Sequence, residues 1–155
     1  MLRMSKLTDY GTLVMTYLAR HPNGLHTANE IADEVSVALP TASKLLKLLA
    51  RAGLVTSTRG THGGYFLARP AREISIAQVI AALEGPIGLT ECASMPGACE
   101  QETGCSVSGN WQRINKVVVG ALQQVTLAEM VAPIFPVDVS RLKIHSSRRV
   151  AALTE

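Results

Sequence analysis

Three cysteines, Cys92, Cys99 and Cys105, lie within fourteen residues, with six residues between the first pair and five between the second. Structural zinc sites usually place cysteines two to four residues apart, because a tight turn brings two thiolates to one ion. The wider spacing suits a larger object, and iron-sulfur clusters are held by thiolates around several metal atoms. Cluster ligation is therefore the favoured interpretation, with thiol redox sensing, zinc binding and inert thiols as alternatives.

Three thiolates leave one ligand position open. A carboxylate, an imidazole, a hydroxyl or an external thiol has the chemistry to fill it. The segment from Pro86 to Asn110 contains several acids but no basic residue and no histidine. The histidines lie elsewhere in the chain, at His21, His26, His62 and His145. The residues alone leave the fourth ligand undecided.

A helix-turn-helix is predicted in the first third of the chain. Thr27 and Glu30 form a capping box for a short helix. After a turn, Pro40 and Gly53 bracket a second helix over residues 40–52. Its apolar stripe is expected to comprise Leu45, Leu48, Leu49 and Ala52, and its basic stripe Lys44, Lys47 and Arg51. A helix with a basic outer face, preceded by a short helix and a turn, is typical of DNA-binding proteins.

The second helix of this pair is the candidate recognition element, because an α-helix fits the major groove of DNA. Its first turns reach base edges, so Thr41, Ser43 and Lys44 are the expected readers. Lys47 and Arg51 lie further along and are better placed for phosphates. The alternative for this basic stripe is an ordinary solvated surface.

A hairpin follows the recognition helix. Two strand-like runs, at 54–58 and 65–68, are separated by the glycine-rich stretch RGTHGG. Arg59 and His62 stand at its tip, where the wing of a winged helix approaches the minor groove or the backbone of DNA. The alternative is a plain hairpin in which the glycines only make the turn.

Helices are also predicted on both sides of this unit. Thr8 is expected to cap a first helix over residues 8–20, and Ser75 with Gln78 opens another that ends near Glu84. Apolar residues then recur with spacings of three and four, at Trp111, Ile114, Val118, Ala121 and Val125. Such a heptad-like seam requires a partner, so we expect a homodimer. Thr126 with Glu129 starts a last short turn.

Composition limits the partners and the compartment. Residues 1–70 hold eight Lys and Arg against four Asp and Glu, whereas residues 71–155 hold seven against eight, so the positive charge lies in the N-terminal half. Aromatic residues make up only 4% of the chain, which argues against single-stranded nucleic acid and for duplex DNA. The sequence shows neither a signal peptide nor a membrane span, so we expect a cytoplasmic protein with no membrane partner and reduced thiols.

These patterns predict a mainly α fold with a small β-hairpin wing. Residues 1–84 form a winged helix-turn-helix DNA-binding domain and residues 85–110 a cysteine-rich cluster-binding loop. Residues 111–132 form a long dimerisation helix and residues 133–155 a flexible basic tail. No nucleophile and base, phosphate loop or carboxylate pair stands out, so no enzyme is expected.

Four features together resemble the IscR and NsrR family of iron-sulfur regulators: K-L-T-D-Y-G near the start, R-G-T-H-G-G-Y at the wing, the three cysteines before N-W, and T-L-A-E-M-V after the long helix. The resemblance spans about residues 1–132 and is nearest to regulators of the Suf cluster-assembly genes. It implies homodimers that hold a 2Fe-2S or 4Fe-4S cluster on Cys92, Cys99 and Cys105.

The resemblance also bears on the fourth ligand. IscR-like members have a histidine three residues after the last cysteine, where this chain has Ser108. NsrR-like members use an aspartate of the partner subunit near the start of the first helix, a position matched by Asp9. Asp9 is therefore the favoured fourth ligand.

The function that follows is a repressor that senses cluster or redox status and controls Suf-type cluster-assembly genes. A nitric-oxide-responsive or thiol-redox repressor of the same fold is one alternative. A winged-helix adaptor that binds protein instead of DNA is another.

Overall fold

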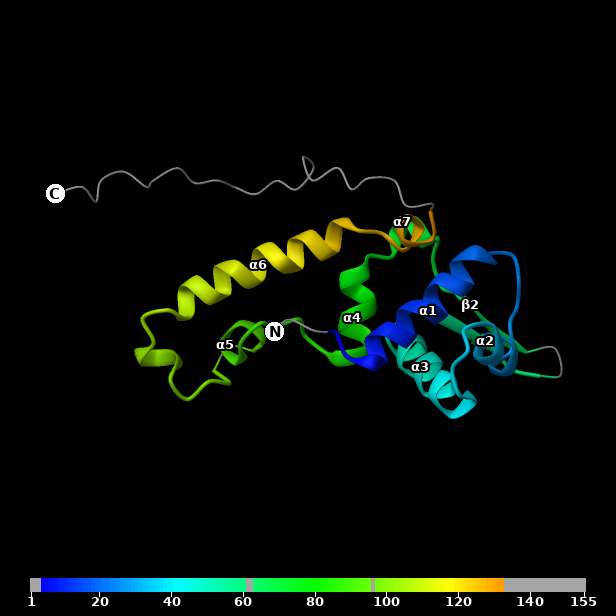
Figure 1. Ribbon diagram of the computed structural model, residues 1–155, viewed down its shortest axis with the longest axis horizontal. Coiled ribbons are helices and arrows are strands. Elements are labelled where there is room, and N and C mark those ends of the chain that lie inside the picture. Colours follow the sequence, from blue (N-terminus) through cyan, green and yellow to red (C-terminus); the bar gives the residue numbers. More distant parts are fainter. Residues whose placement is uncertain (1–3, 61–62, 96, 133–155) are drawn as a thin grey trace.

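The computed structural model describes residues 4–60, 63–95 and 97–132 (Figure 1). His62 and the tail at 133–155 lie outside the described residues. The elements follow in the order α1 (Lys6–Arg20), α2 (Ala28–Glu34), α3 (Leu39–Arg51), β1 (Val55–Thr58), β2 (Gly64–Leu67), η1 (Ala71–Glu73), α4 (Ile76–Glu84), α5 (Glu91–Ser94), η2 (Glu102–Gly104), α6 (Ser108–Gln124) and α7 (Leu127–Val131).

Helix α1 lies at the centre of the winged-helix unit and contacts α3, α4 and α7. Its crossing with α4 is close, because a Cβ atom on Gly11 would overlap the Leu83 side chain. The core between these helices consists of aliphatic side chains from α1 to α4, with one from α7: Val14, Leu18, Ile31, Leu45, Leu49, Val79, Leu83 and Leu127. A short segment far along the chain, α7, therefore completes the core of the N-terminal unit.

The predicted helix-turn-helix is present as α2 and α3. Thr27 and Glu30 form the expected capping box, and Ser36 in the turn takes a positive φ of 53°. Pro40 lies in the first turn of α3, where its missing N–H group costs no hydrogen bond. The buried stripe of α3 differs from the prediction: Ala42 and Leu46 are buried with Leu45 and Leu49, whereas Ala52 is exposed. Helices α1 and α2 both pack on α3, so its buried face is wider than a single seam.

The wing is an antiparallel pair, β1 and β2, in a register from Val55 opposite Leu67 to Thr58 opposite Gly64. Its base is joined to the segment between α1 and α2, since His26 and Tyr65 exchange backbone hydrogen bonds of 3.1 and 2.7 Å. Gly64 allows this close approach, because a Cβ atom there would lie 2.8 Å from the His26 carbonyl oxygen. The wing is thereby held against the helix-turn-helix.

Helix α6 extends away from the winged-helix unit, and the loop with α5 lies below it in Figure 1. The end of α6 returns to the unit through backbone bonds: Ile76 N–H donates to Val125 O (2.9 Å) and Leu127 N–H to Ile74 O (2.8 Å). Thr126 and Glu129 form the predicted capping box, and α7 then packs on α1 and η1. No described helix is both long enough and apolar enough to cross a membrane.

Candidate DNA-reading face and cysteine loop

The predicted DNA contacts share the solvent side of α3. Lys44, Lys47 and Arg51 are exposed, and Thr41 and Ser43 are partly buried near the start of the helix. Four buried residues on the opposite side fix the helix in the core, at Ala42, Leu45, Leu46 and Leu49. Arg59 is exposed beyond the end of β1. These basic side chains are therefore free to meet a polyanion while the helix stays rigidly placed.

The three cysteines lie in the loop between α4 and α6 and are all free thiols. Cys92, on the short helix α5, is buried at 7% exposure, and its sulfur lies 3.3 Å from Thr90 Oγ1. Cys99 and Cys105 are partly exposed. Among the described residues, no three His, Cys, Asp or Glu side chains are grouped to hold a metal ion. In a single chain, then, the loop supplies the donors without bringing them to one point.

The chemistry of this donor set fits an iron-sulfur cluster. Three free thiols on one short loop are the ligands that such clusters use. Gly97 takes a positive φ of 81°, and Gly104 has open space around the position of a Cβ atom. Glycines on both sides of Cys99 leave the backbone free to adjust. Because the three thiols are not grouped in the described residues, binding of a cluster would require the loop backbone to bring them together.

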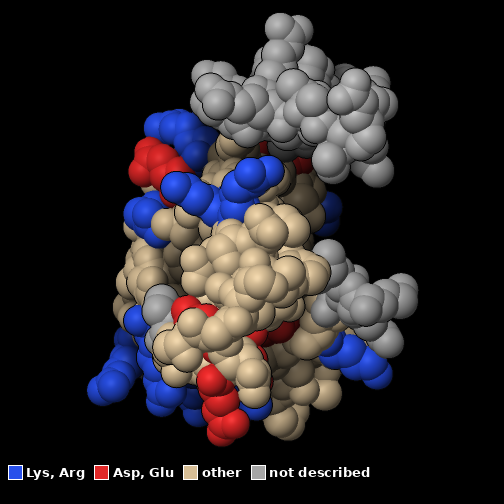
Figure 2. Space-filling model, turned by 90° about the vertical axis from the view of Figure 1, so that its left-hand side faces the viewer, with Lys and Arg blue, Asp and Glu red and all other residues tan. Residues whose placement is uncertain are grey.

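The face that carries this loop differs in charge from α3. Figure 2 looks at the end of the molecule with α5 and the loop, where the centre is uncharged, acidic side chains lie mainly in the lower part, and basic ones lie above the centre and toward the lower edges. The segment from Pro86 to Asn110 indeed has no Lys or Arg. The basic stripe of α3 and the cysteine loop therefore differ in charge.

Asp9 is exposed in the first turn of α1. The predicted cap of this helix was wrong: Ser5 is the N-cap, and its hydroxyl accepts from the backbone N–H groups of Leu7 and Thr8. Thr8 is instead buried and donates its hydroxyl to the Glu84 carboxylate, as does Ser5 at 2.6 Å. These two hydrogen bonds hold the pKa of Glu84 below its ordinary value. The turn that carries Asp9 is therefore tied to the end of α4, where the cysteine loop begins.

Two residues of α6 that sequence reasoning missed organise the cysteine loop. Asn115 is buried and bonds to three backbone groups of the loop, and Gln112 lies one turn before it. The available signal was an asparagine in the middle of an otherwise periodic apolar helix, a position that normally indicates a specific hydrogen-bonding role.

The apolar seam predicted on α6 is largely open to solvent in the single chain. Trp111 is 40% exposed and Ile114 46%, while Val118 and Ala121 are partly buried. Val125 lies just beyond the last helical residue. A row of large apolar side chains without cover on a projecting helix favours association with another helix.

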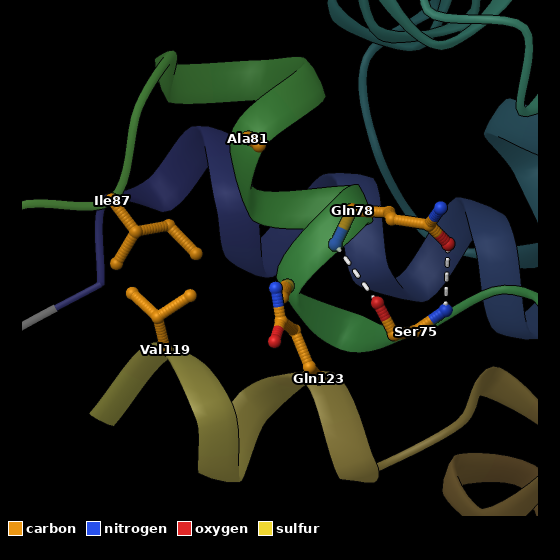
Figure 3. Close-up of a pocket in the computed structure, with 7 residues that line it drawn as sticks. Ser75, Gln78, Ala81, Ile87, Val119 and Gln123 are labelled. Atoms are coloured by element: carbon orange, nitrogen blue, oxygen red, sulfur yellow. Dashed lines mark hydrogen bonds between the residues drawn. The ribbon is translucent and has the colours of Figure 1, made fainter. Parts of the chain in front are cut away.

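A groove of about 480 Å³ lies between α4 and α6 (Figure 3). The Ile87 and Val119 side chains face one another across one end, and Gln123 lies near the Ser75–Gln78 capping box at the other. Helix α6 is hydrogen-bonded on both sides of this groove, by Asn115 to the loop and at Val125 to the start of α4. Helix α6 is thus held at one place to the cysteine loop and at another to the start of α4.

Comparison with known families decides the class of protein. The profile of Rrf2, described as an iron-dependent transcriptional regulator, matches residues 4–133. The chain belongs to the Rrf2 family. The winged-helix expectation and the resemblance to IscR-like regulators are thereby confirmed at the level of the family.

Sequence relatives agree with this placement. A protein of Neisseria meningitidis named as an HTH-type transcriptional regulator is 34% identical over 131 residues, which cover 84% of this chain and 88% of that protein. The protein rrf2 of Nitratidesulfovibrio vulgaris is 28% identical over 149 residues, covering 94% and 99%. This Rrf2 chain is therefore a transcriptional regulator, and its relatives are not enzymes.

Solved structures of Rrf2-like regulators share the fold. CymR, the global cysteine regulator of B. subtilis, aligns with a TM-score of 0.66 at 30% identity, over 84% of this chain and 97% of that one. IscR of T. potens aligns with a TM-score of 0.64 at 32% identity, over 84% and 86%. Both alignments cover 84% of the chain, more than the part that ends with α4 at Glu84, so the shared fold extends beyond the winged helix.

Proposed function

We propose that this chain is a homodimeric repressor that binds a two-fold operator in duplex DNA, and that an iron-sulfur cluster in the cysteine loop sets its affinity. One observation carries the proposal: three free thiols lie in the loop that directly follows α4, a helix that packs on α3. A change in the loop then has a short path to the DNA-reading face. Dimerisation places two recognition helices at a fixed spacing, which such operators require.

The contacts to DNA are divided by position on α3 and the wing. Thr41, Ser43 and Lys44 read base edges in the major groove, and Lys47 and Arg51 contact phosphates. Arg59, and His62 beyond the described residues, approach the minor groove from the wing. The exposure of Lys44, Lys47 and Arg51 leaves these three side chains accessible to DNA.

Lys47→Ala is expected to weaken binding to specific and unrelated duplexes alike. A phosphate contact releases counterions whatever the base sequence, so the slope of log Kd against log salt should fall by about 1. Fluorescence anisotropy with a duplex from the upstream region of the gene, at several salt concentrations, measures this slope. Lys116→Ala, which removes an exposed charge from α6, is the matched control. Equal slopes for Lys47→Ala and the parent protein would place Lys47 outside the DNA interface.

The cluster would be held by Cys92, Cys99 and Cys105 of one chain and by Asp9 of the other. The bound group would supply a redox-active and nitric-oxide-reactive centre, of the 2Fe-2S or 4Fe-4S type. Asp9 is exposed on α1 and so is open to the partner subunit. A carboxylate binds iron more weakly than a thiolate, which gives a labile site suited to sensing.

Asp9→Ala is expected to speed cluster loss while leaving the three thiolates in place. A chelator is added under anaerobic conditions, and the decay of the visible absorption of the cluster measures how fast iron leaves the protein. Loss should be at least about 10-fold faster than in the parent protein, because removal of even a group that only supports a ligand weakens metal binding by about 10- to 100-fold. Asp33→Ala, an exposed acid on α2, serves as the control. Unaltered release from Asp9→Ala would remove Asp9 from the ligand set.

The dimer would form through the apolar seam of α6. Trp111 and Ile114 are the largest exposed residues of that seam, and helices with such spacing pair through interlocking side chains. The targets we propose are Suf-type cluster-assembly genes, since a regulator that senses clusters suits genes that make them.

A thiol-redox or nitric-oxide-responsive repressor is the second candidate. It is favoured by Cys99 and Cys105, which are partly exposed, because thiol sensing requires cysteines that solvent can reach. A structure of Staphylococcus aureus CymR in an oxidized form also matches, at 28% identity and a TM-score of 0.63. Anaerobic purification with iron and sulfide analysis, followed by DNA binding of both forms, separates the candidates. No specific shift of the duplex at low salt would favour a protein-binding adaptor.

A further inference from the structure

Asn115 is the one residue of α6 that is fully buried, with 7% exposure. A buried amide must be hydrogen-bonded, because an unpaired polar group in the interior lowers stability. Its partners are not on its own helix. They are backbone groups of the cysteine loop, 22 to 28 residues earlier in the chain.

The Asn115 amide uses both of its ends. Its Oδ1 accepts from the Leu89 N–H at 3.1 Å, and its Nδ2 donates to the carbonyls of Ile87 at 3.0 Å and Ala93 at 3.3 Å. Ile87 and Leu89 lie just after the end of α4, and Ala93 directly follows Cys92. One side chain thus joins both ends of the segment that leads to the first cysteine.

Gln112 extends the same contact surface by one helical turn, because residues i and i+3 share a helix face. Its Nε2 lies 3.5 Å from the Cys92 carbonyl oxygen and 3.4 Å from Glu102 Oε1. The other oxygen of Glu102 accepts from the Gly97 N–H at 2.7 Å. The parts of the loop around Cys92 and between Cys99 and Cys105 therefore meet at the first half of α6.

We propose that Asn115 is the positioning residue that holds Cys92 in place on α6, so that it sets both the accessibility of the Cys92 thiol and the lifetime of a bound cluster. The part that concerns the lifetime of a bound cluster rests on the function proposed above; the part that concerns the Cys92 thiol does not. With Cys92 held in place, a bound group would have to draw Cys99 and Cys105 toward it. Because α6 also carries the apolar seam, the three hydrogen bonds of Asn115, here called the clamp, join the loop to the helix proposed to form the dimer.

The chemistry of the clamp requires an amide. Leucine has the same number and branching of side-chain heavy atoms, yet it would leave the Leu89 N–H and two carbonyls without their partner. Aspartate could still accept from Leu89, but its ionised carboxylate would face the carbonyl oxygens of Ile87 and Ala93. Neither replacement can reproduce one acceptor and two donors.

The first test uses the cluster-free full-length protein and its reaction with a disulfide reagent that releases a coloured thiolate. In the parent protein, two thiols should react quickly and the buried Cys92 slowly, with peptide mass mapping to assign each phase. In Asn115→Leu, the Cys92 phase should become at least about tenfold faster, because local opening no longer breaks three hydrogen bonds. Gln124→Leu, a change of the same kind at an exposed amide of α6, should leave it unchanged.

An unaltered Cys92 phase in Asn115→Leu would overturn the proposal. An equal acceleration of all three thiols, with a lowered melting temperature, would overturn it as well, since that result indicates general loosening. Asn115→Ser, whose hydroxyl is too short to reach all three partners, carries the test if the leucine variant does not fold. It is judged by the same Cys92 phase.

The second test measures release of iron to a chelator from the anaerobically reconstituted protein. Asn115→Leu should lose its cluster about 10- to 100-fold faster than the parent, while its initial iron content and absorption spectrum stay the same. Equal release rates would overturn the part of the proposal that concerns the cluster. If the parent protein itself binds no iron, the proposed function fails, and the thiol assay still decides the role of Asn115.

Discussion

Cys99→Ala is expected to yield a folded protein that retains no iron-sulfur cluster. Cys99 is partly exposed, so its side chain contributes little to the core and the stability of the chain should hardly change. The proposed cluster, by contrast, has only three thiolates available in this chain. Loss of one would leave two thiolates and the proposed carboxylate of Asp9, too few for a stable site. We expect iron and sulfide to fall from near-stoichiometric values to background.

The assay is anaerobic reconstitution followed by iron and sulfide analysis and an absorption spectrum. Thr103→Ala is the matched control, because Thr103 is an exposed residue between Cys99 and Cys105. This control should keep the colour of the parent protein. Full iron content in Cys99→Ala would refute cluster ligation by the loop and would favour the interpretation of these cysteines as redox thiols.

Leu45→Ala should lower the free energy of unfolding by about 2–5 kcal/mol, as large-to-small changes in a rigid core do. Leu45 is completely buried on α3, and its Cδ2 lies 3.4 Å from the Cβ position of Gly11 on α1. Helix α1 cannot move closer to fill the space, because at Gly11 it already meets Leu83 of α4. Since domains are stable by only about 5–15 kcal/mol, this is a large fraction of the total.

Urea denaturation followed by circular dichroism measures the change, on the cluster-free protein so that ligand binding does not contribute. Leu39→Ala removes the same side chain from the start of the same helix, where it is 43% exposed, and should have a much smaller effect. Similar losses at both positions would contradict the packing described for α3. The comparison also separates a loss of DNA binding by misfolding from a loss by removal of a contact such as Lys47.

Local signals in the sequence were sufficient for most of the winged helix. The capping boxes at Thr27, Ser75 and Thr126 are all present, and both wing strands lie within one residue of their predicted limits. These signals act between residues at most four apart along a helix or across a tight turn, so they do not depend on the rest of the fold. The basic side of α3 was predicted for the same reason.

The predicted helix cap and buried face were wrong where contacts with distant segments of the chain decided which residues cap or are buried. Thr8 was predicted to cap α1, but its hydroxyl is bonded to Glu84, 76 residues later, and Ser5 is the cap. Leu46 is buried because α1 and α2 both pack on α3, and Ala52 is exposed because it lies just beyond the last helical residue. Neither contact leaves a trace in the spacing of nearby residues.

The cysteine loop shows the same division. Three thiols and an acidic segment could be read directly, because residue type alone sets which atoms can bind iron. Asp9 became a candidate ligand only through the resemblance to the IscR and NsrR family. That Cys92 is buried, that Asn115 clamps its turn and that α6 is bonded on both sides of a groove required the folded chain. The Asn115 side chain bonds to backbone groups more than twenty residues away, and such pairings are selected by the packing of whole helices.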